Sequence, residues 1–305
     1  MPQTQRFIFD LMDELKNIPK QHIKLIKEYE EKYRRNLFCY NTLLGHPAGS
    51  IHDIDSQILE NLFRSVDISK YGKRLDLIIN SPGGLPESAE KIIQTIKAYF
   101  KSFRAIIPNM AMSAATLVCM GADKILMSDT SRLGPIDPQM IFTTKEGHQV
   151  MRPAKVFIDA YTIVLQNAIE AISKGAPPQP FYRLLDNQDP SWIMQCIKAR
   201  KATEILAKKF LKINMLSDKT DSEIDKVVKF FFDVGDTFTH GKLINADEAI
   251  LAGLTITKIK IDSEFWSKIW EIYVRIERHT TEKTLAKYFV SREGSIEGQA
   301  KSIGV

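Results

Sequence analysis

Short apolar strands and amphipathic helices alternate between residues 75 and 127, and this alternation constrains the fold more than any other feature. LDLII (75–79), AIIP (105–108) and KILM (124–127) have the near-continuous apolar character of buried parallel strands. A helical pattern from Gly84 and the stretch SAATLVCMGA (113–122) separate them. Strands connected by helices at this spacing form right-handed βαβ units. The sequence therefore predicts an α/β fold with a largely parallel sheet.

The flanking segments define the predicted domain organisation. Before the alternation, residues 37–44 are strand-like and residues 51–66 carry apolar side chains at helical spacing. Beyond residue 150 helices dominate, the last of them over residues 263–290 with an aromatic face. EYEEKYRR (28–35) predicts a solvated helical face. We expect three parts: an N-terminal helical arm (1–35), a main domain (36–260), and a C-terminal helix with a mobile polar tail (261–305).

Composition and charge narrow the function classes. The 305 residues include 44% hydrophobic and 26% charged residues, which is typical of a soluble globular protein. The 42 lysines and arginines only slightly exceed the 37 aspartates and glutamates, and we find no basic block with interleaved aromatic residues. Nucleic-acid binding is therefore not expected. The three cysteines are far apart and lack the spacing of a zinc motif. We expect reduced thiols, a cytoplasmic location, and no metal or other cofactor.

One uncharged segment has the minimum length of a membrane span. Residues 105–122 contain no charge, but Pro108, Asn109, Ser113 and Thr116 lie within them. Pro108 divides the segment into a strand-like half and a helix-like half. A buried strand, a turn and a buried helix explain it better than lipid contact. The N-terminus lacks the apolar stretch of an export signal. We therefore expect no transmembrane segment.

The stretch INSPGG (79–84) interrupts a buried strand with a proline and two glycines. Ligands of parallel α/β sheets bind at the carboxyl ends of strands, where this stretch lies. The glycines allow backbone N–H groups to point outward and a substrate to approach closely. No nucleotide-binding glycine motif is present, so a phosphate loop is disfavoured. An oxyanion hole and an ordinary tight turn both remain open.

The end of the next strand favours the oxyanion hole. AIIPNMAMSAAT (105–116) presents Ser113 among small residues at a strand-to-helix junction. Neighbouring strand ends would then place a glycine turn beside an isolated serine, as acyl transfer requires. Ser113 could instead be a small residue that allows close helix packing. Ser81, beside Pro82, is better explained as a turn residue.

At this point the chain resembles the ClpP/crotonase clan, and within it the serine dehydrogenase proteinase family, which is related to signal peptide peptidase A and the stomatin-operon protease. The motifs are LDLIINSPGG, AMSAATLVCMGADKILM, SRLGPIDPQ and THGKLINADEAILAGLTI. They cover about residues 36–258. The resemblance implies a repeated β-β-α spiral with a largely parallel sheet and extra N- and C-terminal helices. It also implies that residues 36–260 form a catalytic domain.

The resemblance assigns roles to particular residues. Ser113 matches the nucleophile, while Gly84, together with Gly83, and the N–H of Ala114 match the oxyanion donors. The histidine of ClpP-type members is missing from GPIDPQ (134–139). Members of the signal peptide peptidase type use a lysine at the start of a later helix instead, and Lys155 matches it.

The identity of the base stays open between two residues. A lysine has a free pKa of about 10.4, and burial without a carboxylate partner lowers it by up to about 3–5 units, after which Lys155 could deprotonate Ser113. A solvated first-turn lysine is the alternative reading. His240, in FTHGK, is the alternative base, and a structural role in a turn is the alternative to that.

The expected activity is that of a serine endopeptidase with a Ser-Lys dyad, acting on peptide or protein substrates through an acyl-enzyme. The family resemblance and the apolar later helices also imply a homo-oligomer. Two rivals remain. A crotonase-like acyl-CoA enzyme would share the fold and the oxyanion hole, but would need a carboxylate base and an adenine site, neither of which we can identify. A non-catalytic scaffold or binding protein would keep the fold alone.

Overall fold

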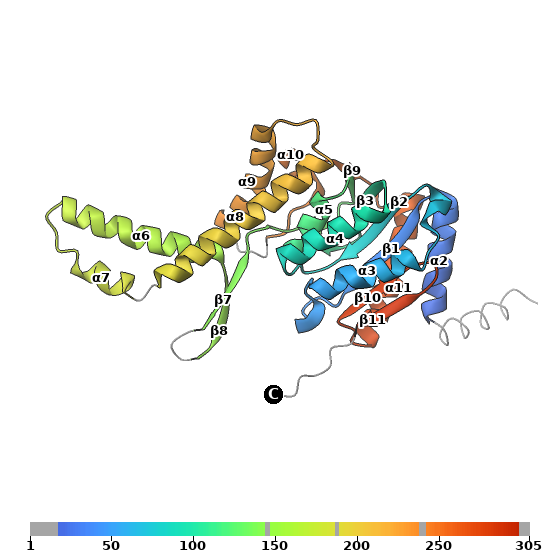
Figure 1. The fold of residues 1–305 in the computed structure, drawn as a ribbon, viewed down its shortest axis with the longest axis horizontal. Helices are drawn as coiled ribbons and strands as arrows, with labels where there is room; N and C mark the ends of the chain where they lie inside the picture. Colours follow the sequence, from blue (N-terminus) through green and yellow to red (C-terminus); the bar gives the residue numbers. More distant parts are fainter. Residues whose placement is uncertain (1–17, 144–146, 187–188, 238–241, 299–305) are drawn as a thin grey trace, which may run out of the picture.

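The computed structural model describes residues 18–143, 147–186, 189–237 and 242–298, which form a seven-stranded sheet covered by helices on both faces (Figure 1). The strands are β1 (Asn36–Thr42), β2 (Arg74–Asn80), β3 (Ser102–Ile107), β4 (Met110–Ala111), β5 (Lys124–Met127), β6 (Arg132–Leu133), β7 (Gln139–Thr143), β8 (Gln149–Pro153), β9 (Ile256–Lys258), β10 (Lys287–Val290) and β11 (Ser295–Gly298). The helices are α2 (Ile18–Tyr33), α3 (Asp53–Arg64), α4 (Pro86–Tyr99), α5 (Ala114–Met120), α6 (Ala154–Ser173), α7 (Gln179–Leu185), α8 (Pro190–Ile213), α9 (Asp221–Thr237), α10 (Ala246–Ala252) and α11 (Glu264–Glu282).

The main sheet is parallel where the sequence pattern predicted it. Its strand order is β11-β10-β1-β2-β3-β5-β9, and β1, β2, β3, β5 and β9 all run parallel. Only β10 and β11 are antiparallel to their neighbours. Because the parallel strands share one direction, the chain segments that follow β1, β2 and β3 all leave the sheet at the same edge.

A second, shorter set of pairings lies beyond that edge. Ser81 bridges Ala111 in parallel, β4 pairs with β6, and Leu133 bridges Ile244 in antiparallel fashion. Each of the main-sheet strands β2 and β3 is therefore followed by a short secondary pairing and then by a helix, which is α4 after β2 and α5 after β3. This is the repeated β-β-α arrangement that the sequence predicted, and the fold class is confirmed.

Side-chain alternation divides the core into two layers. Tyr40, Ile79 and Ile107 point to the face covered by α3, α4 and α5. Cys39 and Ile78, one residue away in their strands, point to the opposite face, which α2 and α11 cover. Helices on both faces account for the near-continuous apolar strands, because both sides of each strand are buried.

The N-terminal part is not a separate solvated arm over its described residues. Helix α2 packs against the sheet and α11, with Ile26, Tyr29 and Glu30 fully or almost fully buried. The buried Glu30 carboxylate accepts a hydrogen bond from Leu37 N at 2.8 Å and pairs with Arg292. The charged pattern of residues 28–35 suggested a solvated face because the partners of Glu30 lie elsewhere in the chain.

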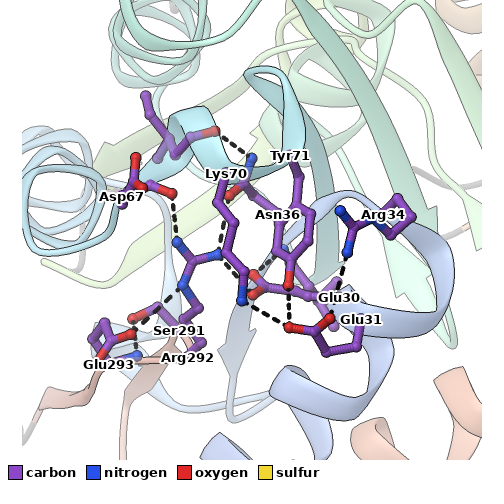
Figure 2. A network of polar contacts seen from close by, with 12 residues as sticks. Glu30, Glu31, Arg34, Asn36, Asp67, Lys70, Tyr71, Ser291, Arg292 and Glu293 are labelled. Carbon is purple, nitrogen blue, oxygen red and sulfur yellow. Dashed lines mark hydrogen bonds and ion pairs between the residues drawn. The ribbon is translucent and has the colours of Figure 1, made fainter.

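The predicted C-terminal helix and mobile tail also differ from the structure. Helix α11 ends at Glu282, and residues 287–298 form the β10–β11 hairpin, which extends the sheet beyond β1. Figure 2 shows how Arg292 anchors this hairpin: its guanidinium donates to Glu30 Oε2 at 2.9 Å, to Asn36 Oδ1 at 3.3 Å and to the carbonyl oxygen of Asp67. Residues 264–298 are thus part of the core domain, whereas residues 299–305 of the predicted tail lie outside the described residues.

Helices α6 and α7 and the N-terminal part of α8 form an arm that projects from the sheet (Figure 1), while the C-terminal part of α8 packs on the core through Ala207, Phe210 and Leu211. Helix α6 packs on α8, but most of its surface is exposed, including Ile163, Ile169 and Ile172 at 54–57%. Among the described residues α6 is the one helix whose length and composition would allow it to cross a membrane, a criterion that helices of soluble proteins also meet. Residues 105–122, which we assigned to a strand, turn and helix, form β3, β4 and the buried helix α5.

Candidate active site

Ser113 lies between β4 and α5 in an unusual backbone conformation. Its φ of 51° and ψ of −120° place a non-glycine residue at positive φ, outside the common left-handed region. Such strain persists only where the surrounding structure enforces it, and it is concentrated at functional sites. The side chain is partly exposed and does not cap α5. A strained serine on a strand-to-helix turn is the geometry of a nucleophile elbow.

The turn after β2 packs directly against Ser113. Gly83 has a φ of 95°, and a Cβ there would lie 2.4 Å from the Met112 carbonyl oxygen, 2.7 Å from Ser113 Cβ and 2.9 Å from Ala114 N. All three distances are shorter than any real contact, so only glycine fits at position 83. The structure thus brings together the two strand ends that the sequence predicted to be neighbours.

The second glycine faces a segment that the sequence motifs did not identify. Gly84 forms a parallel bridge with Ile51, in which Ile51 N donates to Gly83 O at 2.7 Å and Leu85 N donates to Ile51 O at 3.0 Å. A Cβ on Gly84 would lie 2.3 Å from Ile51 N and 2.4 Å from Ile51 O. The glycine pair is therefore required on one side by Ser113 and on the other by the Ile51 backbone.

The three predicted oxyanion donors differ in their hydrogen bonding. Gly83 N donates to Ser81 Oγ at 3.2 Å, which agrees with the turn role expected for Ser81. Within the part of the chain that the structure describes, the N–H groups of Gly84 and Ala114 have no acceptor. Two backbone donors thus remain available beside Ser113, one on each strand end. This geometry favours Gly84 and Ala114 over Gly83 as donors to a substrate oxygen.

Asn80 fixes the two strand ends relative to each other. Its side-chain oxygen accepts from Asn109 Nδ2 at 3.3 Å and from Met110 N at 3.4 Å. The backbones of the same segments pair through Ser81 N to Met110 O and Met112 N to Ser81 O, both at 3.0 Å. The glycine turn and the serine turn therefore form one hydrogen-bonded unit, and its rigidity favours preorganised donors.

A buried polar cluster lies behind the glycine turn. Tyr40, in the C-terminal half of β1, donates to Asp55 Oδ2 at 2.8 Å, and both side chains are fully buried. Burial raises the pKa of Tyr40 well above its usual value, and the adjacent Asp55 charge raises it further. Tyr40 therefore stays protonated and acts as a hydrogen-bond donor. Nothing in the motifs pointed to this cluster, because its members come from separate elements.

Lys155 lies in the first turn of α6, as predicted. Its ammonium pairs with Asp159 Oδ2 at 2.8 Å, and its side chain is 27% exposed. The helix is attached near the serine turn, because Ala154 N donates to Pro138 O at 2.9 Å and a Cβ on Gly134, in the same segment as Pro138, would lie 3.2 Å from Met112 Cα. The carboxylate-free surroundings assumed for a lysine base are not present in this conformation, since Asp159 stabilises the charged ammonium.

The other base candidate, His240, lies outside the described residues. The GPIDPQ segment, where ClpP-type members carry their histidine, places Ile136 in the core and pairs the buried Asp137 with Arg200. The buried pair gives Asp137 a structural role. Among the described residues no cluster of histidine, cysteine and carboxylate side chains could hold a metal ion.

Two curated proteins share part of this sequence. Two uncharacterized proteins of Methanocaldococcus jannaschii are 39% identical over 98 residues and 34% identical over 99 residues, each match covering 32% of this chain. The chain spans only about a third of their length, 34% and 33%. These matches therefore assign no activity.

One solved structure and one family model also match this chain. A mutant of the membrane-bound stomatin-specific protease 1510-N matches 72% of this chain and 79% of its own at 12% identity, with a TM-score of 0.42, a similarity too low to support an argument. The model of a family described as ClpP-like SDH-type serine proteinases matches residues 20–176, which is just over half of the chain. Those residues include both glycines, Ser113 and Lys155. The chain belongs to the family of ClpP-like SDH-type serine proteinases.

Proposed function

We propose that this protein is a serine endopeptidase that cleaves peptide bonds through an acyl-enzyme formed on Ser113. One observation carries the proposal: a strained, partly exposed serine lies against a glycine turn, and two backbone N–H groups beside it lack acceptors among the described residues. Membership of a serine proteinase family supports it.

In the proposed mechanism, Ser113 Oγ attacks the carbonyl carbon of the substrate and gives its proton to the base. The carbonyl oxygen becomes an oxyanion, which accepts hydrogen bonds from Gly84 N and Ala114 N. The base passes the proton to the leaving amine as the peptide C–N bond breaks. Water then attacks the acyl-enzyme with the same base assisting. The acid product is released and the Ser113 hydroxyl is regenerated.

Lys155 is our proposed base, with His240 as the alternative. The Lys155–Asp159 pair must separate for the lysine to act, because the carboxylate favours the charged ammonium and only the neutral amine can accept a proton. Helix α6 emerges from the segment that contacts the serine turn, so a change in the arm could alter both the pair and the position of Lys155. Substrate binding or assembly through the arm would supply such a change.

Covalent labelling with a fluorophosphonate tests the nucleophile. Peptide mapping of the labelled protein should place the adduct on Ser113 and not on the fully buried Ser81. Ser113→Ala should abolish labelling and peptide hydrolysis while the thermal unfolding midpoint stays close to that of the unmodified protein. A folded, unlabelled wild-type protein would refute the peptidase proposal and favour an acyl-CoA enzyme or a non-catalytic scaffold.

We also propose a cytoplasmic homo-oligomer assembled through the projecting arm. Leu165, Ile169 and Ile172 are exposed and lie within about 60° of one another around α6, where they form an apolar surface. Such surfaces are commonly covered by a partner. The three cysteines are buried free thiols, which is compatible with a reducing compartment. Light scattering on the purified chain would measure the assembly, and a monomer at micromolar concentration would refute it.

A further inference from the structure

A lysine of the C-terminal hairpin is buried close to the glycine turn. Lys287 Nζ lies 2.7 Å from both carboxylate oxygens of Asp55, and the two side chains are 7% and 0% exposed. Lys287 begins β10 and lies opposite Thr42, at the carboxyl end of β1. It is outside residues 20–176, the part of the chain matched by the family model. A fully buried carboxylate requires a compensating partner, and Lys287 supplies it.

Asp55 transmits this interaction to the backbone that holds the glycine turn. Its Oδ2 accepts a hydrogen bond from His52 N at 2.9 Å, at the start of α3. The preceding residue, Ile51, forms both hydrogen bonds to the glycine turn, through Gly83 O and Leu85 N. Hydrogen bonds and the Ile51–His52 peptide bond therefore connect Lys287 through Asp55 to the residues beside Gly84.

Tyr40 provides a second link to the same carboxylate. Its hydroxyl donates to Asp55 Oδ2, and its ring stacks on Phe289 of β10 with centroids 4.5 Å apart. The hairpin thus contacts the cluster through one apolar and one charged side chain. Without Lys287 the Asp55 charge would be buried and uncompensated, and water or a shift of α3 would be needed to solvate it.

We propose that Lys287 is a positioning residue for the reaction, because it holds Asp55 and thereby the Ile51 strand in the place that keeps the Gly84 N–H directed toward the substrate oxygen. This inference rests on the proposed function of Ser113 and Gly84. It gives the C-terminal hairpin a part in the chemistry that acts through Asp55 and the Ile51 backbone. Without the pair, the Ile51 backbone would no longer be fixed and the donor would be misaligned.

The same hairpin contains a matched control. Arg292 is also a buried cation with a buried carboxylate partner, Glu30, and their side chains are 6% and 1% exposed. Arg292 also contacts Asn36 (Figure 2). Asn36 begins β1, so the pair lies at the amino ends of the parallel strands, whereas the site lies at their carboxyl ends. Loss of either cation leaves one buried carboxylate without its charged partner, but of the two cations only Lys287 is connected to the glycine turn.

The test compares Lys287→Met with Arg292→Met in the full chain. Hydrogen exchange measures the Ile51 and Leu85 amides, and the rate constant for phosphonylation of Ser113 by a fluorophosphonate measures the reaction. We expect Lys287→Met to accelerate exchange at both amides and to slow phosphonylation by about tenfold to a hundredfold. Arg292→Met should leave phosphonylation within about twofold of wild type at temperatures where it is folded. If Lys287→Met does not fold, Asp55→Asn, which keeps the size of the side chain but removes its charge, replaces it.

Each outcome decides a separate claim. Equal exchange at the two amides in both variants would overturn the inference, and so would faster exchange with an unchanged phosphonylation rate. A similar loss of rate in Arg292→Met would show that general destabilisation is responsible and would also overturn it. If wild-type Ser113 is not labelled at all, the proposed function fails, while the exchange data still decide whether Lys287 holds the glycine turn.

Discussion

A single methyl group on Gly84 should remove most of the peptidase activity. The Cβ of Gly84→Ala would lie 2.3 Å from Ile51 N, 2.4 Å from Ile51 O and 2.8 Å from Ile51 Cα. Non-bonded heavy atoms prefer separations of about 3.5–4.0 Å, so the two backbones must separate by about 1 Å. The obstructing atoms are all backbone, and no side-chain rotation can relieve the clash.

The energetic consequences follow from the bonds at this bridge. Separation weakens the bonds from Ile51 N to Gly83 O and from Leu85 N to Ile51 O, at 2.7 Å and 3.0 Å. Overpacking of this kind typically costs about 1–3 kcal/mol of stability, which a folded domain can tolerate. The displaced Gly84 N–H would no longer meet the oxyanion. Loss of one such donor lowers kcat by about 10²–10³.

The assay is steady-state peptide hydrolysis, with the folded fraction measured by circular dichroism at the assay temperature. Gly294→Ala is the control, because a Cβ there meets no atom within 4 Å and the residue does not have a positive φ. We expect the control to match wild type and Gly84→Ala to lose about 10²-fold or more in kcat while remaining folded. Folded Gly84→Ala protein with kcat within twofold of wild type would refute this account of the oxyanion hole.

Three further predictions concern the base, stability and assembly. Lys155→Ala and Lys155→Arg should both abolish acylation, because a guanidinium stays charged and cannot replace a lysine base. Wild-type activity should rise with pH, because only a neutral lysine accepts a proton. Fast burst acylation by Lys155→Ala in stopped flow, with none by His240→Ala, would assign the base to His240. Burial lowers the pKa of His22 from 6.5 to about 4, so the unfolded chain binds the proton first. The free energy of unfolding should therefore fall by about 3 kcal/mol between pH 6.5 and pH 4, and by less in His22→Phe. Urea midpoints that do not change with pH in the wild-type protein would contradict this. Ile169→Glu with Ile172→Glu should dissociate the assembly in light scattering, whereas Ile54→Glu, an exposed site on α3, should not. An unchanged mass would argue against the arm as the interface.

Local patterns in the sequence determined the elements around the site. The apolar runs at 75–79, 105–108 and 124–127 became β2, the C-terminal half of β3 and β5, because each is buried on both faces of a parallel sheet. The motifs also predicted that the SPGG turn and Ser113 would be neighbours, since parallel strands end at one edge. The glycines at positions 83 and 84 are required by close backbone packing, and such a requirement can be predicted from sequence.

Long-range pairing was decided only in the folded chain. Residues 287–298 read as the end of a helix and a polar tail because Lys287 and Arg292 are charged, yet both are buried against carboxylates of residues 55 and 30. Likewise, nothing near Ile51 predicts that its backbone pairs with Gly84. A charge is compatible with the core only when its partner is present, and that partner lies more than two hundred residues away in the sequence. Sequence patterns report local periodicity and backbone requirements, whereas the choice of distant partners depends on how the sheet closes in three dimensions.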